Sequence, residues 1–466
     1  MLEGVASLLN KSLLQQTEQE GAEPRFLMLQ TLREYGLEML AATGELQGTQ
    51  AAHAHFFLML AEQAEPELQG PHQVVWVERL EREHDNLRAA LEWALEDVVD
   101  KQAAKRRDIA LRLSAALWPF WWARSHYSEA RTFLERTFAR SEEADVSLRA
   151  RVLQAGANVT LHQSDYERAA GMAESCLALY RERGNTRGIA DCLGLLAEFA
   201  WRRGKVTEAI TLSEEQVTLM RQVSEPGKVT DALCTLANMF ARHGELARAE
   251  CLFEEALLLY RKAGNNLGVA ATLIDSATGL WWFSVADVAA IQTIRHRLEE
   301  AQTIITKLGS PYWNARSFWL AALVALSLAE TAQAECLMQE SLAIARGIGD
   351  REGVAWVLHT RGRVEAQRND MTAACSLYQE SLEIALELGD KYLTPYNLEG
   401  LAGVIAAQGE LTWAGQLWGA AEALRERTAL PPCRLLIVSA MSGRWPLPGR
   451  IWESKPSPLH GPRDAL

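Results

Sequence analysis

The feature that most constrains this chain is a repeat with a period of 40 residues. A helix-stop signal, Gly followed by Asn or Asp, falls in phase with it at Gly184, Gly264, Gly349 and Gly389. Two independent markers that share a period indicate a repeat protein whose units pack mainly on their neighbours. The first marker is a small or turn-forming residue followed five positions later by alanine, in two trios 85 residues apart: Ser164/Ala169, Gly204/Ala209, Gly244/Ala249, Ala329/Ala334, Asn369/Ala374 and Gly409/Ala414.

Each unit is predicted to be a helical hairpin. Around Gly244, apolar residues follow the spacing of one buried helix face on both sides of the glycine: Leu233, Leu236, Ala237, Phe240, Ala249, Phe253, Ala256 and Tyr260. One hairpin cannot bury such a face alone, so neighbouring units must stack. This skeleton of small residues, aromatic residues and glycine resembles the tetratricopeptide repeat, with each helix slightly longer.

The phase also predicts the number of units. Six copies follow the period, and a degenerate seventh copy over residues 280–309 accounts for the extra five residues between the trios. One further hairpin, over residues 119–138, precedes the array. The predicted fold class is therefore all-α, a tetratricopeptide-like α-α superhelix or solenoid.

Composition supports a helical body and limits its partners. Seven of the 14 prolines lie in the last 38 residues, so the body has few helix breakers. The formal net charge is -13, which disfavours direct binding to nucleic acid. The seven cysteines are scattered and show no C-x-x-C spacing, as expected for a reducing compartment, and those at 251, 336 and 375 are expected to be small packing residues. No apolar run is long enough for a membrane span, so a cytoplasmic location and no membrane partner are expected.

Residues 1–95 do not follow the period. Residues 1–50 predict a short helix, two strands joined by a polar turn, and a helix for which Thr31 is the expected N-cap and Glu34 its capping-box partner. Residues 51–106 predict a helical connector with two amphipathic helices, over residues 53–66 and 76–95. The array is assigned to residues 107–428. The tail, residues 429–466, is rich in Pro, Arg, Ser and Trp, and is expected to be disordered or a frame-shifted product.

Several phrases resemble one family. "NKSLLQQ", "RFLMLQTLREYGLEML", "HAHFFLMLAEQAEPEL" and "WVERLEREHDNLRAALEWAL" are similar to segments of large bacterial LuxR-type or activator-type transcriptional regulators, which belong to the signal-transduction ATPases with numerous domains (STAND, NB-ARC-like). The resemblance implies that residues 1–50 are a winged-helix remnant and that the array is a sensor. It also implies that an ATPase core would lie before residue 1.

Motifs for catalysis or cofactor binding are absent from the sequence. There is no G-x-x-x-x-G-K-[ST] phosphate loop, and no arrangement of Ser, His and Asp forms a nucleophilic unit. His53 and His55 are two positions apart, so on a helix they point to different faces. We therefore expect no enzyme activity, no cofactor and no metal site.

The candidate binding site is geometric. In stacked hairpins the first helix of each pair lines the concave groove, so the polar and aromatic residues opposite its packing face predict a ligand surface. For each one taken singly, the simpler interpretation is an ordinary solvent-facing residue. The Trp residues at 118, 121, 122, 281 and 282 are expected to serve mainly as core. The groove residues are Arg151, Gln154, Asn158, His162, Asp191, Glu198, Trp201, Arg202, Asp231, Asn238, Arg242, Arg316, Trp319, Trp356, His359, Arg363, Gln367, Tyr396 and Glu399.

The sequence thus predicts a non-enzymatic scaffold that binds a protein, a peptide or a small effector in its concave groove. It would be the sensor or regulatory portion of a bacterial ATPase-type transcriptional regulator. The first alternative is a truncated transcriptional regulator or ATP hydrolase whose nucleotide- and DNA-binding domains lie upstream of residue 1. The second is a remnant without function.

Overall fold

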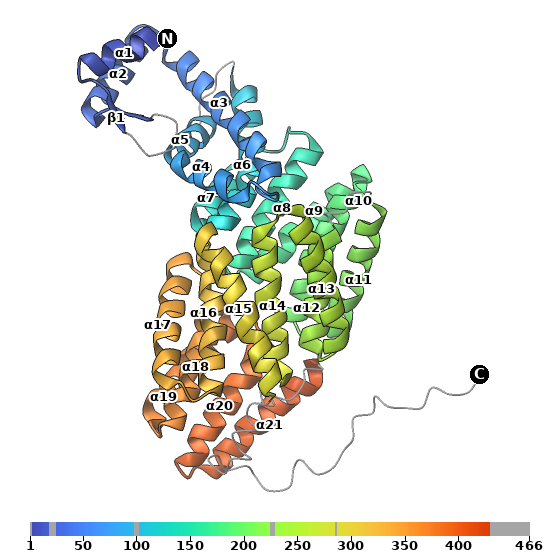
Figure 1. The fold of residues 1–466 in the computed structure, drawn as a ribbon. Helices are drawn as coiled ribbons and strands as arrows, with labels where there is room; N and C mark the ends of the chain where they lie inside the picture. Colours follow the sequence, from blue (N-terminus) through green and yellow to red (C-terminus); the bar gives the residue numbers. More distant parts are fainter. Residues whose placement is uncertain (1, 18–24, 97–101, 224–228, 285–286, 429–466) are drawn as a thin grey trace.

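The computed structural model describes residues 2–17, 25–96, 102–223, 229–284 and 287–428. Within these ranges the chain forms 21 helices and one two-stranded antiparallel sheet. Pairs of antiparallel helices stack side by side in a curved array, which runs from α10 and α11 at the right of the view to α16 and α17 at its left, with a smaller N-terminal segment at one end (Figure 1). The predicted all-α solenoid is confirmed. Residues 429–466, with the tail predicted there, lie outside the described residues.

The N-terminal segment contains the predicted β-hairpin between helices α1 (Leu2–Asn10) and α2 (Gln30–Ala42). Strands β1 (Gln15–Thr17) and β2 (Arg25–Leu27) pair in antiparallel register. The prediction that Thr31 caps α2 is wrong, because the helix begins at Gln30 and its capping position makes no side-chain hydrogen bond. Gln30 Nε2 instead donates to Glu34 Oε1 at 2.8 Å. No residue of α2 is buried, so this helix adds little to the core.

The connector comprises helices α3 (Leu46–Glu67), α4 (Gln73–Arg82) and α5 (His84–Ala94). The sequence predicted α4 and α5 as one helix, but the backbone departs from helical geometry at Glu83, with φ −95° and ψ 7°. The predicted boundaries after residues 50 and 106 fall inside α3 and α6. Both helices are continuous there, over Leu46–Glu67 and Ala103–Arg124.

Eight helical hairpins form the array, in agreement with the predicted number of units. The degenerate seventh copy is the hairpin α14–α15, and the early extra copy is α6–α7. In order, the helices are α6 (Ala103–Arg124), α7 (Tyr127–Phe138), α8 (Val146–His162), α9 (Tyr166–Arg183), α10 (Thr186–Arg202), α11 (Val206–Gln222), α12 (Val229–His243), α13 (Leu246–Ala263), α14 (Asn266–Ser284), α15 (Val288–Leu308), α16 (Pro311–Ser327), α17 (Thr331–Ile348), α18 (Arg351–Gln367), α19 (Met371–Glu387), α20 (Leu393–Ala407) and α21 (Leu411–Thr428).

Packing within a unit follows the apolar spacing. In α12–α13 the alanines at the crossing, Ala237, Ala249 and Ala256, are almost fully buried and let the helices approach closely. Phe240 and Phe253 fill the remaining space. Gly244 between the helices has φ +91°, a left-handed conformation that favours glycine. Two of the cysteines expected to pack beside these alanines, at positions 251 and 336, are exposed instead, so that interpretation is wrong for them.

The superhelix closes on itself through contacts between turns. Ser125 Oγ accepts a hydrogen bond from the backbone N–H of Tyr312 at 3.1 Å, across 187 residues of sequence. Ser164 Oγ accepts from the N–H of Glu352 at 3.1 Å, across 188 residues. Both serines are buried and have positive φ. Each one therefore stabilises the first turn of a helix that lies several units further along the chain.

Two neighbouring contacts extend this closure. Gln73 Oε1 accepts from the N–H of Leu267 at 2.9 Å, which joins the connector to α14. Gly204 lies against α21, where an added Cβ would be only 2.3 Å from Thr428 Cγ2. Early units therefore contact late ones directly, and these contacts border the central space of the superhelix. No helix among the described residues is long and apolar enough to cross a membrane.

Candidate ligand cavity

A cavity of about 700 Å³ occupies the centre of the superhelix. The first helices of successive hairpins line it, as the repeat phase predicts. The α3–α4 turn and the start of α18 complete its wall. The predicted groove residues that line it are Arg151, Gln154, Asn158, His162, Asp191, Glu198, Arg202, Asp231, Asn238, Arg242 and Arg316.

Side chains from adjacent inner helices bond to one another across this wall. Gln154 on α8 donates to Asp191 on α10 at 3.0 Å, and it also accepts from the Tyr180 hydroxyl at 2.9 Å. Asn238 on α12 donates to Asp275 on α14 at 2.9 Å. These bonds fix side-chain orientations before any ligand arrives, which lowers the entropy cost of binding.

Asn158, Glu198 and Asn238 are spaced by 40 residues and occupy one repeat position on α8, α10 and α12. The Asn158 amide donates to the Gln154 carbonyl of its own helix at 2.9 Å. This bond leaves its amide oxygen able to accept a further hydrogen bond. The row thus presents amides on α8 and α12, with a carboxylate between them that is ion-paired with Arg202 and Arg242.

One end of the cavity carries a network of charges centred on Arg202. This guanidinium forms ion pairs with Glu198 at 2.9 Å and with Glu352, and lies 3.9 Å from Asp390. Arg242 also contacts Glu198, at 3.0 Å. Because Glu352 comes from the first turn of α18 and Asp390 from the α19–α20 turn, the network joins early units to late ones.

Burial and ion pairing shift the pKa values of these groups in opposite directions. Burial disfavours the charged form of Glu198, but Arg242 and Arg202 outweigh it and lower the pKa of this carboxyl to about 2. Burial also opposes the charge of Arg202, yet its carboxylate partners, Glu352 foremost, raise its pKa. The site therefore holds fixed charges at neutral pH.

Two aspartates and one histidine of this region respond mainly to burial. Burial, with the nearby charge of Glu352, raises the pKa of Asp350 to about 6. Burial likewise raises the pKa of Asp390 to about 6. The pKa of His162 falls to about 4 because of burial and the charge of Arg316, so the imidazole is neutral at pH 7.

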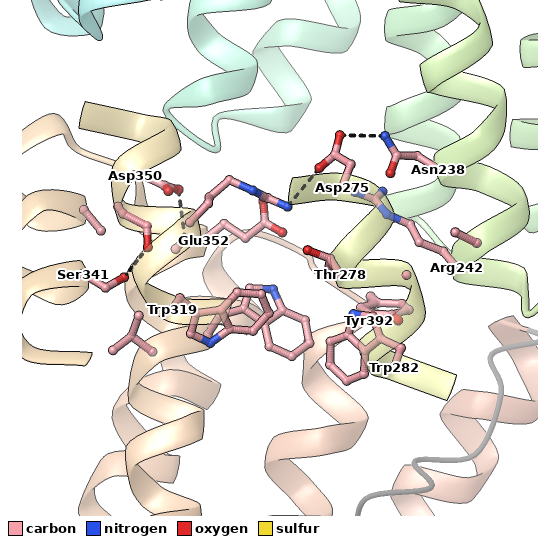
Figure 2. A pocket seen from close by; sticks show the side chains of 18 of the residues that line it. Asn238, Arg242, Asp275, Thr278, Trp282, Trp319, Ser341, Asp350, Glu352 and Tyr392 are labelled. Carbon is pink, nitrogen blue, oxygen red and sulfur yellow. Dashed lines mark hydrogen bonds and ion pairs between the residues drawn. The ribbon is translucent and has the colours of Figure 1, made fainter. Parts of the chain in front are cut away.

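A second, smaller cavity of about 80 Å³ adjoins the charged network (Figure 2). Three predicted residues that do not line the larger cavity line this one: Trp201, Trp319 and Trp356. These rings contact aromatic rings of other hairpins. The ring centroid of Trp356 is 5.3 Å from that of Trp282 and 5.9 Å from that of Tyr392. Arg316 Nη2, at the boundary with the larger cavity, lies 3.6 Å from Asp275 Oδ1.

Five predicted residues line neither cavity: His359, Arg363, Gln367, Tyr396 and Glu399. His359, Tyr396 and Glu399 are buried, and Gln367 is exposed. His359 shares a hydrogen bond of 3.0 Å with Asn397, and Glu399 pairs with Arg425. Their repeat position matches that of the lining residues, but the late inner face is packed rather than open.

Other lining residues escaped the sequence reasoning. Asp350 follows a helix-stop glycine, so the repeat phase predicts only that it caps the next helix. It does cap α18, since its carboxylate accepts a hydrogen bond from the N–H of Gly353 at 2.9 Å, but it lines the cavity as well. Glu352 and Tyr312 reach the cavity because the superhelix closes. Trp118 and Trp122, predicted as core, line the large cavity as well, whereas Trp121 and Trp281 are buried as expected.

Comparison with known proteins agrees with this architecture. The tetratricopeptide repeat family model matches residues 189–275. A crystal structure titled "Rap Protein Complexed with Competence and Sporulation Factor" superposes with a TM-score of 0.56 at 9% identity, covering 81% of this chain and 99% of the other. The fold is a tetratricopeptide-like superhelix. At this identity the likeness concerns the fold alone.

Sequence relatives cover less of the chain. Proteins of Mycobacterium bovis and Mycobacterium tuberculosis, both named "Putative HTH-type transcriptional regulator", are 33% identical over 129 residues. This match spans 28% of the present chain and 14% of each relative. The chain therefore matches about a seventh of the length of these regulators.

Proposed function

We propose that this chain is a non-enzymatic scaffold that binds a peptide or a small polar effector in the central cavity. The observation that carries the proposal is the large cavity itself. Its 700 Å³ lies within the range of about 300–1,000 Å³ that is usual for ligand sites. It is lined by fixed carboxylates, guanidiniums, amides and indoles, a mixture that suits a ligand with both apolar and hydrogen-bonding groups.

The charged residues that line the cavity favour a ligand that is uncharged or that carries both positive and negative groups. Arg202 and Arg242 are neutralised by Glu198 and Glu352, so no excess of positive charge is available for a polyanion. Nucleic acid, with its regular phosphates, fits this surface poorly. A short peptide offers amide groups at regular intervals together with both termini, and so fits the row of polar groups on α8, α10 and α12.

The proposal extends to regulation. The partial match to HTH-type regulators supports a role as the sensor portion of a bacterial transcriptional regulator, in which ligand binding would bias a switch elsewhere in the protein. The assignment to LuxR-type ATPases, with residues 1–50 as a winged-helix remnant, remains part of this proposal. So does the absence of catalysis.

The test is affinity selection of the purified chain against a library of free peptides of five to eight residues, followed by titration of the selected peptides. We expect saturable binding that Asn158→Ala weakens at least about tenfold, because a cavity-facing hydrogen bond to a desolvated ligand is lost. Glu215→Ala, an exposed change on the outer helix α11, is the matched control and should leave affinity unchanged. If no peptide is selected, or if Asn158→Ala binds normally, the cavity is not the peptide site.

A second measurement separates the scaffold from an ATP hydrolase. The same preparation is titrated with a fluorescent ATP analogue in the presence of Mg²⁺. The scaffold proposal predicts no saturable binding. Saturable affinity would favour the alternative of a nucleotide-binding enzyme.

A further inference from the structure

A cluster of two histidines and two glutamates joins the connector to the first hairpin of the array. Glu81 lies at the end of α4, His84 begins α5, His126 precedes α7, and Glu129 lies in the first turn of α7. His84 Nε2 is 2.7 Å from Glu129 Oε1, and His126 Nε2 is 3.3 Å from Glu81 Oε2. None of these residues lines the central cavity, so the cluster is independent of the proposed function.

The two imidazoles are stacked. Their centroids are 4.5 Å apart and their planes differ by 22°, and both rings lie beside Phe120, at 5.6 Å. A neutral imidazole has one ring nitrogen with a free lone pair, and such nitrogens are common ligands of late first-row transition metals.

Two ion-pair partners and one hydrogen-bond donor surround the carboxylates. Arg124 Nε lies 3.2 Å from Glu81 Oε2, and Arg88 Nε lies 3.1 Å from Glu129 Oε2. Trp121 Nε1 donates to Glu129 Oε1 at 3.3 Å. Partners of this kind hold the ligands of known metal sites in position. The two guanidiniums also offset the carboxylate charge, which disfavours Ca²⁺ and Mg²⁺ because those ions depend on oxygen ligands of high negative charge.

Solvent can reach the cluster. The side chains of His84 and His126 are 19% and 28% exposed, and that of Glu81 is 39% exposed. Among the described residues, Glu81, His84 and His126 are the group whose potential ligand atoms converge, with all three atoms within 4.8 Å of one another. Tetrahedral ligands at Zn²⁺ distances of about 2.0–2.1 Å lie roughly 3.4 Å apart, so small side-chain rotations would complete the site.

We propose that Glu81, His84 and His126 form a binding site for a divalent transition-metal ion, best matched by Zn²⁺, with Glu129 as the fourth ligand or as the orienting partner of His84. The ligands come from both the connector and the α6–α7 hairpin. Arg124, next to the site, also donates to the carbonyl of Leu308 at 3.1 Å, at the end of α15. A bound ion would therefore fix the connector against the array near one of the contacts that close the superhelix.

The competing interpretation is a network of ion pairs and hydrogen bonds that needs no metal. The Glu129 carboxylate raises the pKa of His84 through their hydrogen bond, against the effect of burial, and so favours a protonated imidazole. In that case protons occupy the positions that the metal would take. Metal titration distinguishes the two directly.

The experiment uses the full chain without a histidine tag, stripped with EDTA and titrated with Co²⁺ and Zn²⁺ separately. We expect one equivalent of Co²⁺ to bind with the visible absorption of a tetrahedral site, Zn²⁺ to displace it, and the unfolding temperature to rise. His84→Gln and His126→Gln should each weaken binding at least about tenfold. The matched control is His72→Gln, which removes an exposed histidine from a simple pair with Glu67 at 2.8 Å in the same connector.

Far-UV circular dichroism verifies that each variant is folded. If either histidine variant is misfolded, Glu81→Gln takes its place, because Glu81 is the most exposed of the three ligands. Loss of binding in a folded variant, with His72→Gln unchanged, supports the site. No saturable binding by the natural chain, or binding that the folded variants retain, overturns it.

Discussion

The inner helices of the early and late units have the same repeat phase but different surroundings. On α8, α10 and α12 the inward residues face a cavity of about 700 Å³ and bond to each other through amides and carboxylates. On α18 and α20 the corresponding His359, Tyr396 and Glu399 are buried, where they contact aromatic rings and where Glu399 pairs with Arg425. The comparison shows that the inward direction of a side chain does not by itself make a ligand surface. Whether space remains in front of it depends on how the superhelix closes.

Charge marks the boundary between these regions. The Arg202 network lies where early turns meet late ones, and its carboxylates come from both sides. The network thus connects early turns of the superhelix to late ones and also lines part of the cavity. The following variants test the comparison, beginning with the largest expected effect.

Arg202→Ala should lower the free energy of unfolding by about 3–5 kcal/mol, because it leaves Glu198, Glu352 and Asp390 without their shared cation. Urea unfolding followed by circular dichroism measures the loss. Arg221→Ala is the control: it removes an exposed pair with Glu255, whose closest atoms are 3.8 Å apart, and should cost less than about 1 kcal/mol. Equal effects in the two variants would show that closure does not depend on this network.

Tyr396→Ala should cost about 3 kcal/mol through loss of buried ring contacts, but should leave ligand affinity nearly unchanged. Asn158→Ala should do the reverse, with a stability change below about 1 kcal/mol and a clear loss of affinity. Parallel urea unfolding and peptide titration check both. A strong loss of affinity in a folded Tyr396→Ala protein would contradict the division into open and packed regions.

Asp390→Asn tests the effect of burial on a boundary carboxylate. The folded-state pKa of about 6 lies above the usual value of 3.8, so the folded protein keeps a proton that the unfolded chain loses. The contribution of Asp390 to stability therefore falls as pH rises from about 4 to about 6. Asparagine has no charge to bury and still accepts hydrogen bonds from the N–H groups of Tyr392 and Leu393.

The asparagine variant should consequently be more stable than the natural chain by up to about 2 kcal/mol at pH 7, with the difference vanishing below about pH 4. Urea midpoints measured across this pH range give the result. Asp370→Asn, at the exposed start of α19, controls for loss of a capping carboxylate. A natural chain more stable than Asp390→Asn at pH 7 would show that the attraction to Arg202 exceeds the cost of burial.

Ser164→Ala should have the smallest effect, a loss of about 1 kcal/mol, because it removes the acceptor for the N–H of Glu352. Thermal unfolding measures it. Ser175→Ala removes a hydroxyl of the same helical hairpin that bonds only to the Gly171 carbonyl of its own helix, and should be nearly neutral. A neutral Ser164→Ala would indicate that the turn contact adds nothing to closure.

Much of the fold was predictable because its information is local. The spacing of Leu236, Phe240, Ala249 and Phe253 sets the hairpin, and the period repeats that information along the chain. The break between α4 and α5 was missed because EREHDN contains neither proline nor glycine. The absence of a side-chain cap at Thr31 was missed for a similar reason, since a suitable sequence does not fix where a helix begins.

The sequence by itself therefore determined the hairpin unit, the number of units and the face of each helix that points inward, since these depend on residues within a few turns of one another. Only the tertiary structure decided which inward faces stay open, because closure joins Ser164 to Glu352 and Arg202 to Asp390 across nearly half of the chain. No local period carries contacts of that range. The same holds for the His84–His126 stack, which two unrelated helix ends bring together.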